Sequence, residues 1–336
     1  MAEEWTPESL RKLALGYMPS AALLAAAELD IFAALGREPA SAPQLATRLR
    51  TDPRATEILA DALASLGLLE KREDLYFPAP GTLGALTADA AASILPFARH
   101  HANTLRAWAR LADVVESGRP IALEPGIRGA EADHVAYIET MAANARQAPE
   151  VIAALGGLEF DHLLDVGCGP ATWAIALLRA VPGARATLFD LPEVLPISSR
   201  HVEAAGLGDR VTFVSGDYRT DETLPAGVDL VWISAVAHMN SRQQNRELFA
   251  KAHAAMRPGG HLMIRDIVMD ETHTEPVFGA MFAVLMLART ESGGTYSYDE
   301  FKEDLDAAGF DAPELFRSKF DMDTIIRARR AEKDGT

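Results

Sequence analysis

The sequence predicts an α/β protein whose second half is a doubly wound parallel sheet, preceded by a smaller helical domain with a winged-helix pattern. Beyond residue 161, short apolar runs alternate with segments of helical length, which is typical of parallel strands covered by helices on both faces. One of these runs ends in a glycine turn that leads directly into a helix. Before residue 160 the periodicity is helical apart from one hairpin.

The N-terminal domain is predicted element by element. Segment 17–35 is rich in Ala and Leu with few charges on any face, which predicts one helix buried on nearly all sides. Capping signals then open helices over 41–49 and 51–67. Segment 68–77 has the pattern of two short strands around a charged turn. Three helices followed by a hairpin make a winged helix.

Charge argues against DNA as the partner of this winged helix. Residues 1–100 carry 9 Lys or Arg and 13 Asp or Glu. The helix at the recognition position holds Glu57 and Asp61 beside Arg54, and carboxylates would face phosphates unfavourably. The apolar leading helix is better explained by packing against a second copy of the chain. We therefore expect a homodimer, with a DNA-binding regulator that carries a ligand-sensing domain as the alternative from another class.

The composition of the whole chain favours an enzyme that acts on a small molecule. The 336 residues include 48 Asp or Glu and 32 Lys or Arg, a formal net charge of −16, which disfavours nucleic acid and anionic membranes as partners. The longest apolar run, 278–288, is shorter than the roughly 20 residues of a membrane span. No signal peptide is predicted. The single cysteine, Cys168, excludes an internal disulfide and fits a cytoplasmic protein without a thiolate metal site.

The second half is expected to contain five parallel strands with intervening helices. The strands are predicted over 162–166, 185–189, 211–214, 228–234 and 261–268. The helices are predicted over 170–180, 193–205 and 241–256. Two final runs, 314–317 and 323–329, are candidates for an antiparallel hairpin at one edge of the sheet.

The turn after the first of these strands is the most informative segment, with the sequence LLDVGCGP over 163–170. Its two glycines let the backbone come close to a ligand, and Pro170 has the fixed φ of a first helical turn. The third glycine of a dinucleotide fingerprint would stand at Thr172, so an NAD dehydrogenase is disfavoured.

Two further strand ends carry acidic side chains. Asp190 lies about 20 residues beyond the glycines, where a carboxylate can accept both hydrogen bonds of a ribose diol. Asp217 and Tyr218 follow the third strand, where they can accept from an adenine amino group and pack on its ring. Because the carboxyl ends of parallel strands line one crevice, these residues together predict a nucleoside site.

With these residues in place, the chain resembles the dimeric Class I S-adenosylmethionine-dependent small-molecule O-methyltransferases of plant caffeate and bacterial polyketide-tailoring type. The resemblance is carried by DVGCGPA from 165, LFDLPEV from 188, DRVTFVSGDY from 209, MRPGGHLMIRD from 256 and DLDAAGF from 304. It implies a winged-helix dimerisation domain over 1–100, linking helices that contribute to the acceptor pocket over 101–157, and a Rossmann-like methyltransferase sheet over 158–336. The implied cofactor is S-adenosyl-L-methionine.

The resemblance also assigns cofactor contacts by position. It places the cofactor's methionine part over Gly167 and Gly169, its ribose on Asp190, and its adenine beside Leu191, Asp217 and Tyr218. Ser234 stands where the family often has Lys near the adenine, so this contact is expected to differ. Ala171 and Cys168 replace glycines that are usual or frequent in the family, which makes cofactor affinity the first quantity to measure.

The resemblance places the catalytic groups at the next two strand ends. Methyl transfer is an in-line attack on a sulfonium methyl, which requires alignment and a base for the acceptor hydroxyl. His238 falls at the position of that base, and Asp266 at the position of the acid that orients it. A salt bridge between Asp266 and neighbouring Arg265 is the structural alternative. The family usually follows the histidine with Asp-Trp, and this chain has Met239 and Asn240 instead.

The acceptor pocket is assigned by resemblance to Met141, to Met281 and Phe282 on helix 276–289, and to Tyr296, which replaces a second acid. A plain core stripe is the alternative interpretation of that helix. Soft apolar walls favour a flat aromatic or polyketide-like acceptor from secondary metabolism. The sequence leaves open whether oxygen, nitrogen or carbon is methylated. The altered residues keep open a non-methylating reaction on the same fold, namely hydroxylation, decarboxylation or a pericyclic step.

Overall fold

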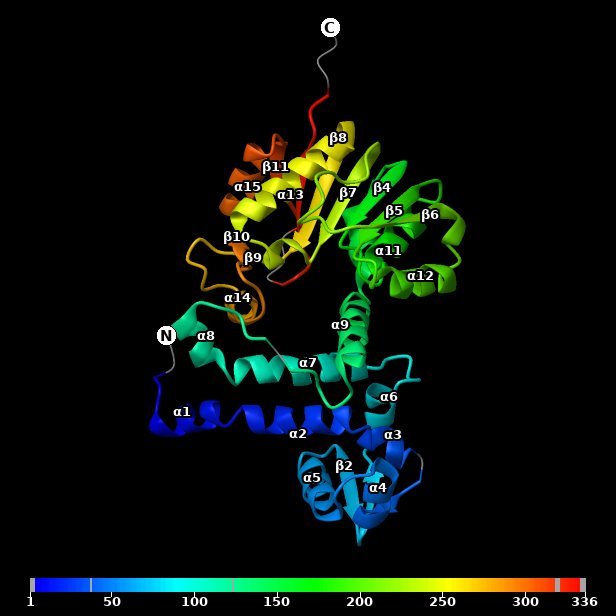
Figure 1. Cartoon of the computed structure of the whole chain (residues 1–336), viewed down its shortest axis with the longest axis vertical. Coiled ribbons are helices and arrows are strands. Elements are labelled where there is room, and N and C mark those ends of the chain that lie inside the picture. Colours follow the sequence, from blue (N-terminus) through cyan, green and yellow to red (C-terminus); the bar gives the residue numbers. More distant parts are fainter. Residues whose placement is uncertain (1–3, 37, 123, 318–320, 333–336) are drawn as a thin grey trace. The chain divides into compact units, whose positions relative to one another are not determined.

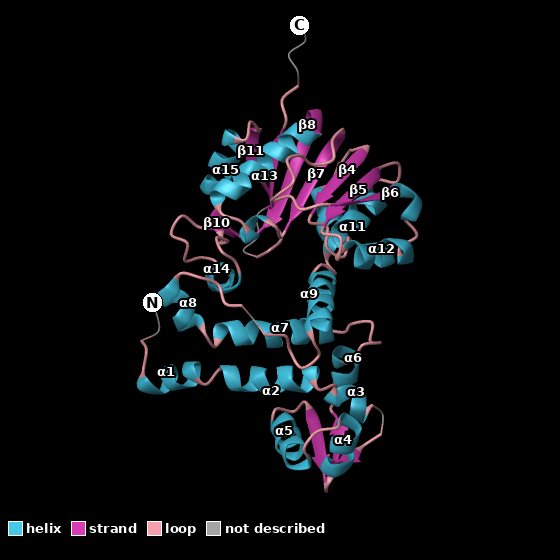
Figure 2. Cartoon of the chain, viewed as in Figure 1, coloured by secondary structure: helices cyan, strands magenta, loops and turns pink. Residues whose placement is uncertain are grey.

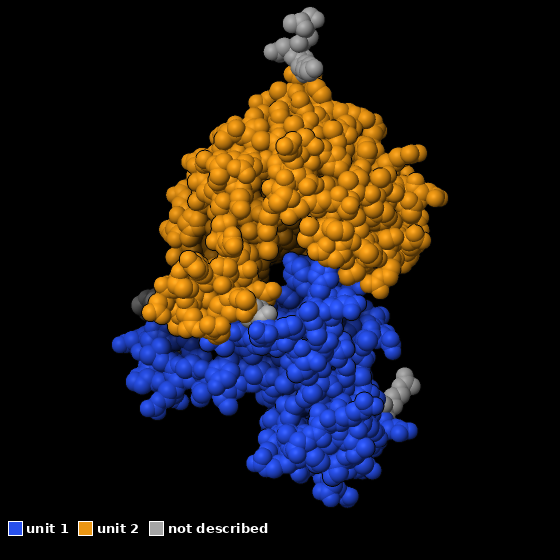
Figure 3. Space-filling model, in the orientation of Figure 1, with its two compact units in different colours: residues 1–109, 123–143 blue, residues 110–122, 144–336 orange. Residues whose placement is uncertain are grey.

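The computed structural model describes residues 4–36, 38–122, 124–317 and 321–332. The chain folds into two compact units, which Figure 3 shows in different colours. Unit 1 comprises residues 1–109 and 123–143, and unit 2 comprises residues 110–122 and 144–336. The expected linking segment 101–157 is therefore divided between the two units.

Unit 1 is mainly helical (Figures 1 and 2). Its helices are α1 (Pro7–Ala14), α2 (Tyr17–Glu28), α3 (Ile31–Leu35), α4 (Ala42–Leu49), α5 (Pro53–Ser65), α6 (Thr82–Leu86), α7 (Leu95–Trp108) and α9 (Ala130–Asn144). Three short strands, β1 (Ala40–Ser41), β2 (Leu69–Arg72) and β3 (Leu75–Pro78), form an antiparallel sheet in the order β1-β3-β2. Helices α3 to α5 with this sheet confirm the predicted winged helix.

The prediction of one continuous helix over 17–35 is wrong. The helix breaks after Glu28, and Asp30 adopts the left-handed conformation with φ of 61°. The Asp30 carboxylate accepts from Arg99 and from Arg128, both distant in sequence, and these contacts stabilise the break. Burial of this segment within the chain is uneven, because Tyr17 is 58% exposed whereas Ala26 and Ile31 are fully buried in the core of unit 1. The predicted packing of the segment on a second copy stays a prediction.

Asp61, whose charge argued against DNA binding, has a structural partner in unit 1. Its Oδ1 accepts from the hydroxyl of Tyr76 and from Nζ of Lys71, each at 2.7 Å. Asp61 lies on α5 and its two partners on the hairpin. These contacts therefore join the helix to the strands over the core of the winged helix.

Unit 2 is built on a seven-stranded sheet in the order β11-β12-β8-β7-β4-β5-β6. Its strands are β4 (His162–Val166), β5 (Arg185–Asp190), β6 (Val211–Ser215), β7 (Val228–Ser234), β8 (Met256–Asp266), β11 (Asp311–Arg317) and β12 (Thr324–Arg329). Strands β4 to β8 pair in parallel, and β12 and β11 add an antiparallel edge. The predicted doubly wound sheet and edge hairpin are confirmed.

Two element boundaries in unit 2 differ from prediction. Strand β8 begins at Met256 and ends at Asp266, because the MRPGG segment joins the sheet, and β9 (Val268–Met269) pairs separately with β10 (Tyr296–Ser297). Pro170 lies in the turn before the helix that it was predicted to open. Ala171, with φ of 62°, caps that helix, and a left-handed residue must precede the first helical turn here.

Helices α10 (Ala148–Leu155), α11 (Thr172–Ala180) and α12 (Leu195–Ala204) cover one face of the sheet, and α13 (Arg242–Ala255) and α15 (Tyr298–Ala307) cover the other (Figure 1). Two further helices of unit 2, α8 (Leu111–Ser117) and α14 (Val277–Arg289), contact each other away from these two cores. Short 3₁₀ turns are η1 (Gly208–Arg210) and η2 (Ala237–Met239). Within the described ranges, every helix is too short or too polar to cross a bilayer.

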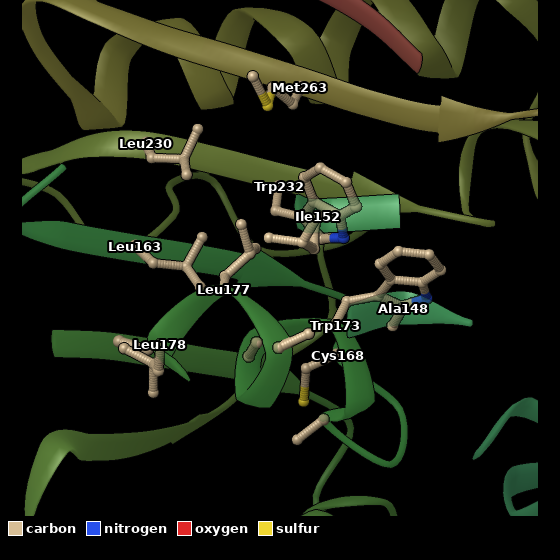
Figure 4. Packing of buried hydrophobic residues seen from close by; sticks show 14 of the residues in the cluster. Ala148, Ile152, Leu163, Cys168, Trp173, Leu177, Leu178, Leu230, Trp232 and Met263 are labelled. Atoms are coloured by element: carbon tan, nitrogen blue, oxygen red, sulfur yellow. The ribbon is translucent and has the colours of Figure 1, made fainter. Parts of the chain in front are cut away.

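Alternate residues of each central strand enter opposite cores. On β7, Trp232 packs with Trp173 and Leu177 from α11, as Figure 4 shows. Its neighbour Ile233 points to the other face, where it packs with Phe249 from α13. This alternation follows from the pleat of a strand, and burial on both faces explains why the strands are almost entirely apolar.

Candidate active site

The two glycines of the turn after β4 have different surroundings. A side chain at Gly167, where φ is 70°, would place its Cβ 2.7 Å from Cγ2 of Val236. At Gly169, where φ is 51°, a Cβ would meet no atom of the described chain within 4 Å. Gly167 is therefore required for packing, whereas Gly169 borders open space that a ligand can enter. Ala171 also has positive φ, a conformation that costs a non-glycine residue about 1 kcal/mol.

Asp190, at the end of β5, is tied to this turn. Its Oδ2 accepts from the backbone N–H of Gly169 at 2.7 Å, and its Oδ1 accepts from that of Leu191 at 2.8 Å. Burial raises the pKa of this carboxyl, while the two N–H groups oppose the rise. The structure thus brings three of the predicted cofactor residues together at one strand end, and each carboxylate oxygen retains a lone pair for a further donor.

Asp165 is a candidate that sequence reasoning missed. It lies in β4 just before the glycine turn and is 2% exposed. Its Oδ2 has no hydrogen-bond partner within the described part of the chain. Burial and the nearby charge of Asp190 raise its pKa to about 8. The signal in the sequence was an acid inside an apolar strand, but only the structure shows that Oδ2 of this carboxyl has no partner in the described part of the chain, while the backbone of Ala174 bonds to the carboxyl.

Asp217 and Tyr218 follow β6 as predicted. Oδ1 of Asp217 accepts from the N–H of Arg219 at 2.9 Å, so this carboxylate also shapes its own turn. The Tyr218 hydroxyl donates to Oδ1 of Asn240 at 3.1 Å. Burial raises the pKa of Tyr218, which keeps the hydroxyl protonated. The Arg219 guanidinium lies over the ring, 5.6 Å from its centroid, so both the hydroxyl and one face of Tyr218 have partners within the chain.

Ser234, at the end of β7, is paired with a buried cation on the next strand. The sheet register places Ser234 beside Arg265, whose Nη1 donates to Ser234 Oγ at 3.1 Å. The guanidinium lies 4.3 Å from the centroid of Trp173 and donates from Nε to Asp323 at 2.8 Å. Arg265 therefore pairs with Asp323, and the alternative salt bridge between Arg265 and Asp266 does not form.

His238 and Asp266 form a buried pair. Nδ1 of His238 lies 2.8 Å from Oδ1 of Asp266, and the His238 backbone N–H donates to Oδ2 at 3.2 Å. Oδ1 also accepts from the N–H of Ile267 at 2.8 Å. Because a carboxylate only accepts, the facing ring nitrogen carries the proton, which leaves the lone pair of a neutral imidazole on Nε2. This is the arrangement that a general base requires.

The loop before β10 supports the backbone of the same turn. The N–H of Gly294 donates to the carbonyl of His238 at 3.0 Å. A Cβ at Gly293 would lie 2.5 Å from that carbonyl oxygen, so glycine is required there. The hydroxyl of Tyr296 donates to the carbonyl of Asn240, and burial raises the Tyr296 pKa to about 12. Tyr296, predicted in the acceptor pocket, thus anchors the turn that carries His238.

The residues assigned to the acceptor pocket do not share one environment. The ring of Phe282 meets the edge of His238 with centroids 4.8 Å apart at 87°. On the same helix Met286 is buried whereas Met281 is 49% exposed, so the stripe is only partly core. Met141 lies on α9 in unit 1, and its role stays a prediction. Among the described side chains no three His, Cys, Asp or Glu gather as metal ligands.

The site fits a nucleoside cofactor that carries a positive charge. A Cβ at Gly169 would meet no described atom within 4 Å, and Asp190 at the end of β5 accepts from the Gly169 N–H. One oxygen of the buried Asp165 carboxyl has no partner in the described chain. These features and the parallel sheet define an enzyme of the Rossmann-like class with a histidine and aspartate pair at the neighbouring strand ends.

Comparisons with known proteins give the family. The family model of the O-methyltransferase domain matches residues 126–311, and that of the O-methyltransferase dimerisation domain matches residues 11–81. The tetracenomycin polyketide synthesis 8-O-methyl transferase TcmO of Streptomyces glaucescens is 30% identical, covering 90% of this chain and 91% of that protein. The 3-hydroxy-5-methyl-1-naphthoate 3-O-methyltransferase of Streptomyces sahachiroi is also 30% identical, covering 90% and 89%. The solved structure of PigF with SAH shares the fold, with a TM-score of 0.86, 23% identity and coverage of 97% and 100%.

The chain belongs to the O-methyltransferase family and is an S-adenosyl-L-methionine-dependent methyltransferase. Its winged helix lies within the match to the family's dimerisation domain, which removes the basis for the DNA-binding alternative. The incomplete glycine fingerprint that argued against an NAD dehydrogenase agrees with this assignment.

Proposed function

We propose that this enzyme methylates a hydroxyl of a small aromatic or polyketide-like metabolite, with His238 as general base. The observation that carries the proposal is the buried pair of His238 with Asp266. Nε2 accepts the proton of the acceptor hydroxyl while the oxygen attacks the methyl group, and Asp266 stabilises the resulting imidazolium. S-adenosyl-L-methionine supplies the electrophilic methyl on its sulfonium, and S-adenosylhomocysteine is the second product.

The cofactor is held, in this proposal, by the carboxyl ends of three strands. Gly167 and Gly169 border its methionine part, and Asp190 accepts from the ribose. Leu191, Asp217 and the ring of Tyr218 flank the adenine, with Ser234 and its Arg265 partner nearby. Asp165 faces the cationic amino group of the methionine part, because its buried Oδ2 has no partner in the described chain and a nearby positive charge stabilises a carboxylate.

The acceptor is proposed to be a flat aromatic hydroxyl compound held in unit 2 against Phe282, Met281 and Tyr296. The edge contact of Phe282 with His238 supports this, since it places an apolar wall beside the base. The relatives from Streptomyces are named for a tetracenomycin polyketide and a hydroxynaphthoate.

We also propose a cytoplasmic homodimer. The match to the dimerisation domain supports the dimer, as does helix α1, none of whose described residues is buried within the chain. The single cysteine supports the location.

The test uses cofactor with an isotope-labelled methyl group and a panel of hydroxynaphthoates and polycyclic phenols. We expect labelled methyl ether from at least one of them, and a fall of about 10²- to 10⁴-fold in turnover for His238→Ala, with S-adenosylhomocysteine binding retained. The exposed His273 provides the control variant His273→Ala, which should turn over normally. Unchanged turnover in His238→Ala overturns the base assignment. Label on nitrogen or carbon overturns O-methylation, and acceptor consumed without label supports the non-methylating reaction.

A further inference from the structure

A directed chain of hydrogen bonds joins Tyr218 to the turn that carries His238. The Tyr218 hydroxyl meets Oδ1 of Asn240 at 3.1 Å, and Nδ2 of Asn240 donates to Oδ1 of Asn245 at 3.1 Å. Nδ2 of Asn245 then donates to the carbonyl of Ala237 at 3.0 Å. These hydrogen bonds therefore run from Tyr218, beside the proposed adenine site, to Ala237, the residue before His238.

The chemistry of the groups fixes the direction of this chain. The Ala237 carbonyl can only accept, so the Asn245 amide must present its Nδ2 there and its Oδ1 to Asn240. Asn240 must then donate from Nδ2, which leaves its Oδ1 to accept from the Tyr218 hydroxyl. Every donor has an acceptor, and no other orientation of the two amides satisfies all three bonds.

Both amides in this series of hydrogen bonds are buried, so losing one of the bonds leaves polar groups without a partner. Asn240 is 0% exposed and Asn245 is 1% exposed. An apolar residue at position 240 would leave the Tyr218 hydroxyl and the Asn245 oxygen without this partner. A buried polar group left without a partner destabilises the folded turn. Asn240 is thus held by its side chain on one side.

The backbone of Asn240 is held on the other side. Its carbonyl accepts from the hydroxyl of Tyr296, and its N–H donates to the carbonyl of Ala237 at 3.2 Å. The Gly294 N–H holds the His238 carbonyl within the same turn. The turn is therefore joined to Tyr218 through Asn240, to the loop before β10 through Tyr296 and Gly294, and to β8 through Asp266.

We propose that Asn240 is a positioning residue that couples occupancy of the cofactor site at Tyr218 to the placement of His238. The inference rests on the proposed function, in which the Tyr218 ring packs on the adenine and His238 is the base. A ligand that fixes the Tyr218 ring fixes its hydroxyl, and through Asn240 and Asn245 it fixes the turn and the direction of His238 Nε2. The base is aligned most accurately when the methyl donor is bound.

The test separates this coupling from a purely structural role. Tyr218→Phe keeps the ring that packs on the ligand and removes only the hydroxyl, while Asn240→Leu keeps the volume and removes both side-chain bonds. For each we expect kcat to fall about tenfold, or ~1.4 kcal/mol, while the Kd for S-adenosylhomocysteine changes less than about threefold. The double variant should lose no more kcat than the more impaired single variant, because both changes break one chain.

Tyr298→Phe is the matched control, since its hydroxyl donates to the Pro313 carbonyl at 2.7 Å elsewhere in unit 2 and should leave kcat unchanged. If kcat losses in Tyr218→Phe and Asn240→Leu add in the double variant, the two residues act separately and the proposal is overturned. Full kcat in Tyr218→Phe also overturns it, and this mild variant keeps the test valid if Asn240→Leu does not fold. Retained turnover in His238→Ala would overturn the base assignment, and this result is distinct from the Tyr218 and Asn240 results that test the coupling.

Discussion

Asp165 and Asp266 are equally buried, each 2% exposed, and lie on strands of one sheet, yet their surroundings are opposite. Both oxygens of Asp266 accept hydrogen bonds, from His238 and from Ile267. Oδ2 of Asp165 has no partner in the described chain, and the pKa of this carboxyl rises to about 8. Burial alone therefore does not define the role of a carboxyl. Asp266 orients the imidazole of His238, whereas Asp165 keeps one oxygen without a partner, which in the proposed function faces the cofactor's amino group.

Asp266→Asn, which changes the carboxylate whose oxygens both accept hydrogen bonds, is expected to have the largest effect on activity. An amide can donate to Nδ1 of His238, which favours the tautomer with the proton on Nε2, and that tautomer cannot accept the acceptor's proton. We expect the single-turnover rate to fall about 10²- to 10⁴-fold with the Kd for S-adenosylhomocysteine nearly unchanged. Asp270→Asn, in an exposed loop, serves as control. A rate within threefold of wild type would show that Asp266 is not needed to orient the base.

Asp165→Asn, which changes the carboxyl with one unpartnered oxygen, is expected to have a smaller effect, on cofactor affinity. The substitution removes the carboxyl that, in the proposed function, ionises against the cofactor's amino group, and a hydrogen bond to a charged group contributes about 1.5 to 3 kcal/mol. Calorimetry should show S-adenosylhomocysteine binding weakened about tenfold or more, with kcat at saturation less affected. Asp306→Asn, at the surface, should bind like wild type. Equal affinity in Asp165→Asn would place the amino group elsewhere.

The smallest effect concerns the pH dependence of stability without cofactor. The Asp165 pKa is raised from 3.8 to about 8 in the folded chain, so folding takes up a proton between these values. The stability that this group contributes is fully present below pH 3.8 and is lost as pH rises through about 8.

We therefore expect the drop in Tm from pH 6.5 to pH 8.5 to be smaller in Asp165→Asn than in wild type, by about 2 to 4 °C. Differential scanning calorimetry of the two proteins at both pH values measures this. Asp306→Asn should keep the wild-type pH dependence. A parallel drop in Asp165→Asn would mean that Asp165 is already ionised at pH 6.5.

Local signals account for what the sequence predicted correctly. The strands of unit 2 are continuous apolar runs bounded by turn residues, and Asp190 and Asp217 follow from their positions at strand ends, whereas His238 and Asp266 were predicted from the family resemblance. The break at Asp30 was not predictable, because a left-handed aspartate depends on Arg99 and Arg128, which only the fold brings to it. Asn240 was interpreted only as a changed pocket wall, since its partners are separated from it in sequence.

The sequence by itself determined the fold class and the strand ends proposed to hold the cofactor, because period, turn chemistry and motif spacing are properties of short segments, and the family resemblance pointed to His238 with Asp266. Only the tertiary structure decided which charges and amides pair. Arg265 and Asp266 are neighbours on one strand and point to opposite faces, so Arg265 meets Asp323 and Trp173 while Asp266 meets His238. Pairing between residues far apart in sequence depends on which side chains the packed sheet and helices bring into contact. For Oδ2 of Asp165 they bring none within the described chain.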